Sequence, residues 1–298
     1  MRAKMVYFSD QEGGVRPQTE EVYSVPAWGG ICAEISARIN DGSFGASYPE
    51  VCRDGSGPIG TDEAAFWQAM RSQIPSLETR PWYDAGDNVP PLPVAMDIIQ
   101  FCWNSVGLPA PRAYHDYFQH YHLAYDAPAG RDKFCQTINV IFRRNGMAYS
   151  FSADGSIERI PHPVLREALA PCNFATGDAE LDTILEVARR KFLHCDAQVR
   201  REALEKLWDA FERLKTVGPG ANKRLQAGQL LDRMAGTQSA RFRELLETEA
   251  VALREIGNGF QIRHSETTQE KVNDSAHVDY LFHRLFAFIQ LALRAIAQ

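Results

Sequence analysis

The sequence predicts an α+β protein: a mixed N-terminal domain with a small antiparallel β-meander, followed by an all-helical bundle. Strand-like segments and hairpin turns occur within residues 136–160, and after Pro163 every segment has the apolar spacing of amphipathic helices. The length of 298 residues is enough for two cores. We therefore expect an N-terminal domain of unclear role at residues 1–175 and a helical domain at residues 176–298.

Helices and connectors make up most of the expected N-terminal domain. Residues 28–39 read as a helix because isoleucines recur four apart on one face. Thr61 is a candidate cap for a helix that ends near Ser72. Residues 80–93 contain four prolines, which indicates a stiff connector, and residues 94–106 read as a buried helix.

The expected meander lies at residues 136–160. Its three segments read TINVIF, AYSF and SIERI, which are rich in β-branched and aromatic residues. The dipeptides Asn145-Gly146 and Asp154-Gly155 separate them, and both are typical of hairpin turns.

The second domain reads as helices throughout. The expected segments are 163–170, 179–193, 198–215, 223–234, 238–256 and 277–296. The last of these is apolar on more than one face, so we expect it to lie centrally in the bundle and to provide an apolar seam for a homodimer.

Charge and cysteine content limit the class of protein. The net charge of −6 gives no overall basic character, and the acidic excess falls in residues 1–175, where 14 Lys and Arg face 20 Asp and Glu. Residues 176–298 carry 18 of each sign and tolerate a nucleic-acid partner better. The six cysteines show no disulfide framework, and no signal peptide or long apolar run is present. We therefore expect a cytoplasmic protein outside the membrane.

One polar stretch interrupts the last two helical segments. Residues 256–266, IGNGFQIRHSE, combine two glycines with Asn258, Arg263, His264 and Glu266. A helix that ends at the glycines would let these side chains cluster, with His264 moving a proton and Arg263 meeting charge on a phosphodiester. The alternative is a helix C-cap in which the same groups only hold a turn.

Glu249 stands in an otherwise apolar stripe of the preceding helix. A carboxylate in such a place needs a partner, because an unpaired buried charge is very costly. We expect Arg263 to be that partner, which fits a structural ion pair as well as an active centre.

Three other patterns carry weaker signals. Residues 113–126 offer His115, His120 and His122, and a His-x-His pair on a strand suits a metal. His115 does not share a helical face with His120, however, and the interleaved aromatics indicate packing, so we expect no metal and no cofactor. Arg189 and His194 have a spacing that arises easily by chance. The segment GPG at 218–220 lacks the core of a phosphate-binding loop.

The C-terminal half resembles the HEPN domains of AbiJ-type bacterial abortive-infection proteins. The segments that carry the resemblance are FRRNGMAYSFSADGSIERI, REALEKLWDAFERLK and IGNGFQIRHSE. The resemblance implies a phage-defence protein and a metal-independent endoribonuclease with RNA as partner. It makes Asn258, Arg263 and His264 catalytic, with Glu249 and Glu266 in support. The family has Arg before the Asn, where this chain has Gly257, so the alternative is a catalytically inactive binding or dimerisation module.

Overall fold

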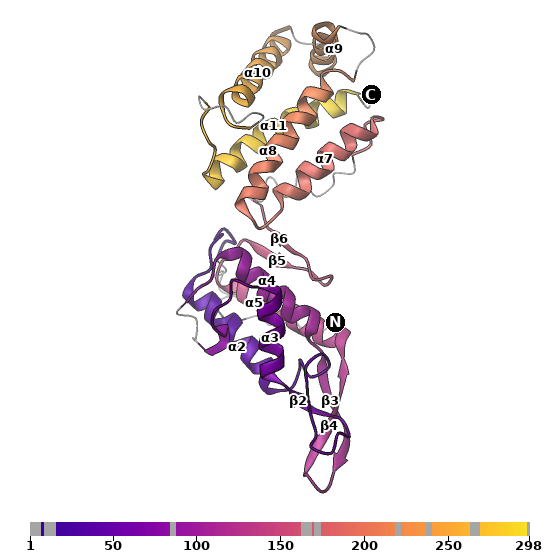
Figure 1. Ribbon diagram of the computed structural model, residues 1–298. Helices are drawn as coiled ribbons and strands as arrows, with labels where there is room; N and C mark the ends of the chain where they lie inside the picture. The colour runs from indigo at the N-terminus through magenta and orange to yellow at the C-terminus, as the bar shows by residue number, and fades with distance from the viewer. Residues whose placement is uncertain are drawn as a thin grey trace. The chain divides into compact units, whose positions relative to one another are not determined.

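The computed structural model describes residues 7–8, 16–83, 88–161, 169, 174–217, 222–236, 240–262 and 269–296. Contacts divide the chain into two compact units, residues 1–160 and 161–298. The boundary predicted from the sequence, at 175–176, lies about fifteen residues further along the chain. Figure 1 shows the helices and strands of each unit.

In the part of unit 1 that the structure describes, the α-helices are α2 (Val25–Asn40), α3 (Glu63–Gln73), α4 (Leu92–Ser105) and α5 (Ala127–Arg144). A 3-10 turn, η1 (Pro81–Tyr83), lies in the proline-rich connector. The predictions of helices at 28–39 and 94–106 are confirmed. The cap of α3 is Asp62, whose carboxylate accepts the Ala65 N–H, and not Thr61, which ends a strand.

The predicted three-stranded meander is wrong in its first strand, because TINVIF lies in α5. Asp126 caps this helix by accepting the Ala129 N–H at 3.0 Å. Phe134, Ile138 and Phe142 follow at four-residue intervals and are fully buried, so burial on one helical face outweighs the β-branched composition. Asn145-Gly146 accordingly ends a helix instead of joining two strands.

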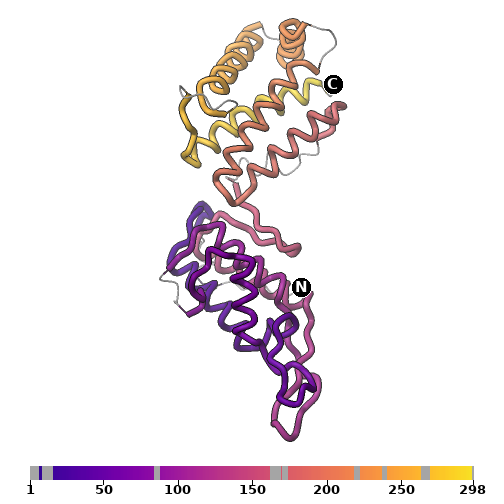
Figure 2. The backbone as a smooth tube through the Cα atoms, viewed as in Figure 1, coloured from indigo at the N-terminus to yellow at the C-terminus, as the bar shows by residue number. Residues whose placement is uncertain are grey.

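Each sheet of unit 1 is an antiparallel pair of strands. The pairs are β1 (Pro49–Val51) with β2 (Pro58–Thr61), β3 (Leu108–His115) with β4 (His120–Asp126), and β5 (Tyr149–Phe151) with β6 (Ile157–Arg159). The predicted turn at Asp154-Gly155 joins the last pair. The β3–β4 hairpin extends beyond the helices of its unit, and β2 packs beside β4 (Figures 1 and 2).

Unit 2 is all-helical in the residues that the structure describes, as the sequence predicted. Its helices are α7 (Ala179–Phe192), α8 (Ala197–Leu214), α9 (Lys223–Ala235), α10 (Ala240–Gly259) and α11 (Ser275–Ile296). Side chains of α11 are buried against α8 and α9, which confirms the central place expected for the last helix. The expected helix at 163–170 lies almost entirely outside the described residues.

The glycine that was expected to end α10 is packed inside it. Gly257 is buried, and a Cβ built there would lie 2.4 Å from Cδ1 and Nε1 of Trp208. The Trp208 indole is fully buried and donates to the Leu253 carbonyl at 3.0 Å. Gly257 therefore serves the close approach of α10 to an indole ring, and the helix continues to Gly259.

The described segments contain neither a disulfide bond nor a helix that could span a membrane. Cys32, Cys52, Cys102, Cys135 and Cys195 form no disulfide bond with one another. Among the helices whose placement is described, none combines the length and apolar character of a membrane span.

Candidate metal centre

The β3–β4 hairpin brings three histidines to one face. His120 and His122 alternate on β4 and so point to the same side, and His115 on β3 is directly opposite His120 in the register. The centroids of the three imidazole rings form a nearly equilateral triangle, with sides of 5.6, 5.5 and 5.5 Å. On a helix the spacing of His115 and His120 would place them on different faces, whereas the hairpin makes them neighbours.

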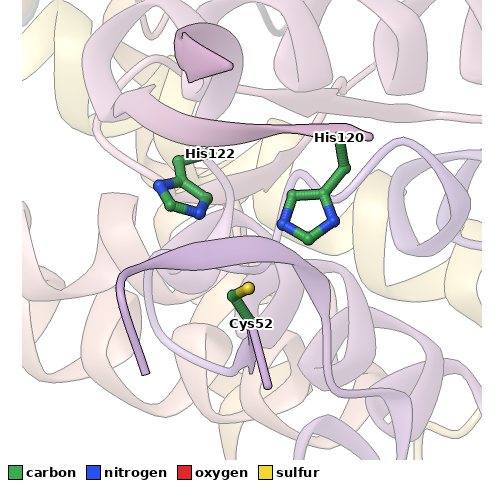
Figure 3. A group of neighbouring side chains, drawn as sticks. All are labelled: Cys52, His120 and His122. Carbon is green, nitrogen blue, oxygen red and sulfur yellow. The ribbon is translucent and has the colours of Figure 1, made fainter. Parts of the chain in front are cut away.

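The loop between β1 and β2 supplies a thiol and a carboxylate to the same place. Cys52 opens the loop, its N–H donating to the Gly57 carbonyl at 2.9 Å. Asp54 holds the loop together, because its Oδ1 accepts from both the N–H and the hydroxyl of Ser56, at 3.0 and 2.6 Å. Figure 3 shows the Cys52 side chain directed toward His120 and His122, which project from β4.

Two overlapping groups of donors could hold an ion. One atom each from Cys52, His120 and His122 lies within 4.8 Å of the others, and so does one atom each from Cys52, Asp54 and His115. Tetrahedral zinc, with bonds of about 2.0 Å to nitrogen and 2.3 Å to sulfur, separates its ligand atoms by about 3.5 Å. Either group therefore reaches bonding geometry after movements of about 1 Å. Thiolate with imidazole is the donor set of zinc and related transition metals.

Hydrogen bonds assign the protons of His115 and show that both of its ring nitrogens are occupied. Its Nδ1 accepts the Phe118 N–H at 3.3 Å. Its Nε2 lies 2.6 Å from Oδ2 of Asp54, and an ionised carboxylate only accepts, so Nε2 carries the proton. A neutral His115 thus has both nitrogens satisfied without a metal.

The same reasoning leaves one nitrogen of His122 with a free lone pair. The Ser56 hydroxyl gives its proton to Asp54, so at 3.0 Å from Nε2 of His122 the hydroxyl accepts and Nε2 donates. The neutral ring then offers its lone pair at Nδ1. A metal-ligating histidine usually donates its other N–H in this way, which fixes its tautomer and orientation.

His120 carries a polar atom that lacks a partner. Its Nε2 is buried and, within the described residues, makes no hydrogen bond. Leaving such a group unsatisfied costs about 1–3 kcal/mol. A metal ion shared with Cys52 would satisfy this atom, so the donor set of the site fits a transition metal.

The electrostatics of the loop favour a charged carboxylate. The hydrogen bond from the Cys52 side chain, followed by those from Ser56 and His115, holds the pKa of Asp54 well below its usual range. Elsewhere in unit 1, burial raises the pKa of the thiols of Cys102 and Cys135. Those two cysteines are therefore poor candidates for a thiolate ligand.

The structure places the sequence-predicted site of unit 2 only in part. Asn258 is exposed near the end of α10, and its backbone carbonyl accepts from Nε2 of Gln269 at 2.8 Å. Arg263, His264 and Glu266 lie outside the described residues. Their convergence with Asn258 therefore stays a prediction.

Glu249 pairs with a cation of the last helix. Both its carboxylate oxygens accept from Arg284 of α11, at 2.7 and 2.9 Å. The expectation of a bonded carboxylate is confirmed, whereas the expected partner Arg263 lies outside the described residues, so that pairing stays a prediction. Glu249 is half-buried, with 32% of its side chain exposed, because the stripe of α10 turns partly to solvent.

The second histidine pattern of unit 2 is structural. Arg189 pairs with Glu186 on the same helix, at 2.7 and 2.9 Å. His194 accepts the Asp196 N–H through Nδ1 at 3.0 Å, just before α8 begins. Arg189 is therefore engaged within α7, and His194 stabilises the turn between α7 and α8.

The chain matches no family model, no curated protein and no solved structure. One sequence signal pointed to the metal centre: a His-x-His pair on an alternating segment, which two-residue periodicity places on one face of a strand.

Proposed function

We propose that unit 1 is a metal-binding domain that holds Zn²⁺ or a related transition-metal ion through Cys52, His120 and His122. The observation that carries the proposal is the buried Nε2 of His120, which has no partner among the described residues and faces a thiol and a second imidazole (Figure 3). Such a constellation is costly without an ion and is satisfied by one.

Metal content and cobalt substitution of the full chain test this proposal. The purified protein should contain about one equivalent of metal, lose it to a chelator, and show a thiolate-to-cobalt charge-transfer band when reloaded with Co²⁺. Cys52→Ser and His120→Ala should lose the band. His277→Ala removes an exposed histidine of unit 2 and is the matched control. A wild-type protein that binds neither Zn²⁺ nor Co²⁺ contradicts the proposal.

We further propose that unit 2 binds RNA and acts in phage defence, cleaving RNA through Asn258, Arg263 and His264. A groove of about 1270 Å³ formed by α8, α9 and α10 supports an anionic partner. Its cationic lining residues outnumber its acidic ones six to two: Arg213, Lys215, Lys223, Arg224, Arg243 and Arg254 against Glu212 and Glu247.

Three of these cations are available to a ligand. Lys223, Arg224 and Arg254 are exposed and form no ion pair with any described residue, whereas Arg213, for example, is engaged by Asp178. Phosphate contacts of this kind make affinity fall steeply with salt.

RNA cleavage by the full chain in EDTA tests the second proposal, because chelation separates it from any metal chemistry of unit 1. His264→Ala should reduce cleavage by about 10²–10⁴-fold, the usual contribution of general acid–base catalysis. Replacing Lys223, Arg224 and Arg254 together by Ala should weaken binding of single-stranded RNA and lower its salt-dependence slope by about 2. RNA binding without cleavage would favour the inactive binding module. If the protein neither binds nor cleaves RNA, RNA is excluded as the partner.

A further inference from the structure

The metal centre has three candidate protein ligands. A fourth side chain, His115, lies beside them, and both of its ring nitrogens form hydrogen bonds to other groups. Cys52, His120 and His122 place a thiol sulfur and two imidazole nitrogens within 4.8 Å of one another. The ring of His115 stands 5.6 and 5.5 Å from the rings of His120 and His122. A nitrogen of His115 and a carboxylate oxygen of Asp54 also lie within 4.8 Å of the Cys52 sulfur, so these two side chains border the centre.

His115 is held away from the metal by two hydrogen bonds. Its Nδ1 accepts from the Phe118 backbone, and its Nε2 donates to Asp54 at 2.6 Å. To coordinate, the ring would have to give up one of these bonds. Asp54 is fixed in turn by the two bonds from Ser56, so the loop resists that movement.

Water reaches this side of the centre. The side chains of His115 and Asp54 are 21% and 37% exposed, whereas Cys52 is buried. Three protein ligands with a solvent-facing fourth position are typical of catalytic zinc sites, while structural sites close the fourth position with protein.

We infer that the metal of unit 1 keeps one exchangeable coordination position, bordered by His115 and Asp54, that takes water or a small anionic donor. This inference rests on the proposed metal binding and adds to it that the site is open. A ligand that enters there displaces a water molecule and meets the paired His115 and Asp54 at its edge. The chemical class it fits is a monodentate anion or the oxygen of a carbonyl or phosphoryl group.

Azide titration of the cobalt-loaded full chain tests the inference. Cobalt d–d absorption reports coordination, so azide should shift those bands in the wild-type protein, saturably and with unchanged thiolate charge transfer. His115→Ala should respond to azide in the same way, because His115 is not a ligand in an open centre.

The opposite pattern would overturn the inference. If azide leaves the wild-type spectrum unchanged while His115→Ala gains an azide response, His115 is the fourth ligand and the centre is closed. Failure of the underlying metal proposal looks different, because the wild-type charge-transfer band would then be missing before azide is added. The wild-type titration decides the matter even if the His115 variant does not fold, and His277→Ala controls for azide effects elsewhere on the chain.

Discussion

Gly257→Ala should destabilise unit 2, although alanine is the better helix former. A Cβ at this position would lie 2.4 Å from two atoms of the Trp208 ring, a distance that real Cβ contacts do not reach. The ring cannot move freely, because it is fully buried and its Nε1 donates to the Leu253 carbonyl at 3.0 Å. The added methyl group therefore forces either α10 or the indole out of place.

The magnitude follows from three opposing contributions. Overpacking a core costs about 1–3 kcal/mol, and weakening one buried hydrogen bond costs about 1 kcal/mol. Replacing glycine by alanine inside a helix returns about 1 kcal/mol. Gly257→Ala should therefore lower the free energy of unfolding by about 1–3 kcal/mol, which corresponds to a fall in Tm of about 4 °C per kcal/mol for a unit of this size.

Urea and thermal unfolding monitored by tryptophan fluorescence measure this change, with Gly228→Ala as the matched control. Gly228 lies inside α9, and a Cβ there would meet nothing within 4 Å. The control should be neutral or more stable by up to about 1 kcal/mol. If both variants are stabilised equally, Gly257 does not pack on Trp208 and the reasoning is refuted.

Three more outcomes are expected. Ser56→Ala removes the hydrogen bond that fixes the tautomer and orientation of the His122 ring, so Co²⁺ binding should weaken by about 10–100-fold in competition with a chelator. Unchanged affinity would show that Ser56 does not orient this ring. The pKa of Asp54 is depressed on folding, so the stability that Asp54 contributes is present above about pH 4 and is lost as pH falls through the lowered pKa. Carboxyl NMR of wild type against Ser56→Ala should show that pKa rising in the variant. Arg284→Ala breaks a partly exposed pair with Glu249 and should cost about 1 kcal/mol or less in urea unfolding; a larger loss would mean that packing of the arginine dominates.

The sequence identified helices well where their apolar residues repeat along one face. The α8 stripe of Leu204, Leu207, Trp208, Phe211 and Leu214 is buried throughout, as the 3.6-residue period requires. The prediction from sequence failed at TINVIF, because β-branched composition shows only a local preference for strands. Phe134, Ile138 and Phe142 are buried on one face of a helix, and the surface that covers this face is formed only in the folded protein. The same limit applies to Gly257, whose role depends on an indole from another helix.

What the sequence determined by itself is therefore the α+β class, the helical second half and the His-x-His alternation that puts His120 and His122 on one face. The tertiary structure decided the rest of the metal centre. Cys52 comes from a different hairpin, and His115 joins the histidine pair through strand register, which brings together residues that no single periodicity relates. Periodicity describes neighbours within one element, whereas a site assembled from two hairpins depends on pairings that long-range packing alone selects.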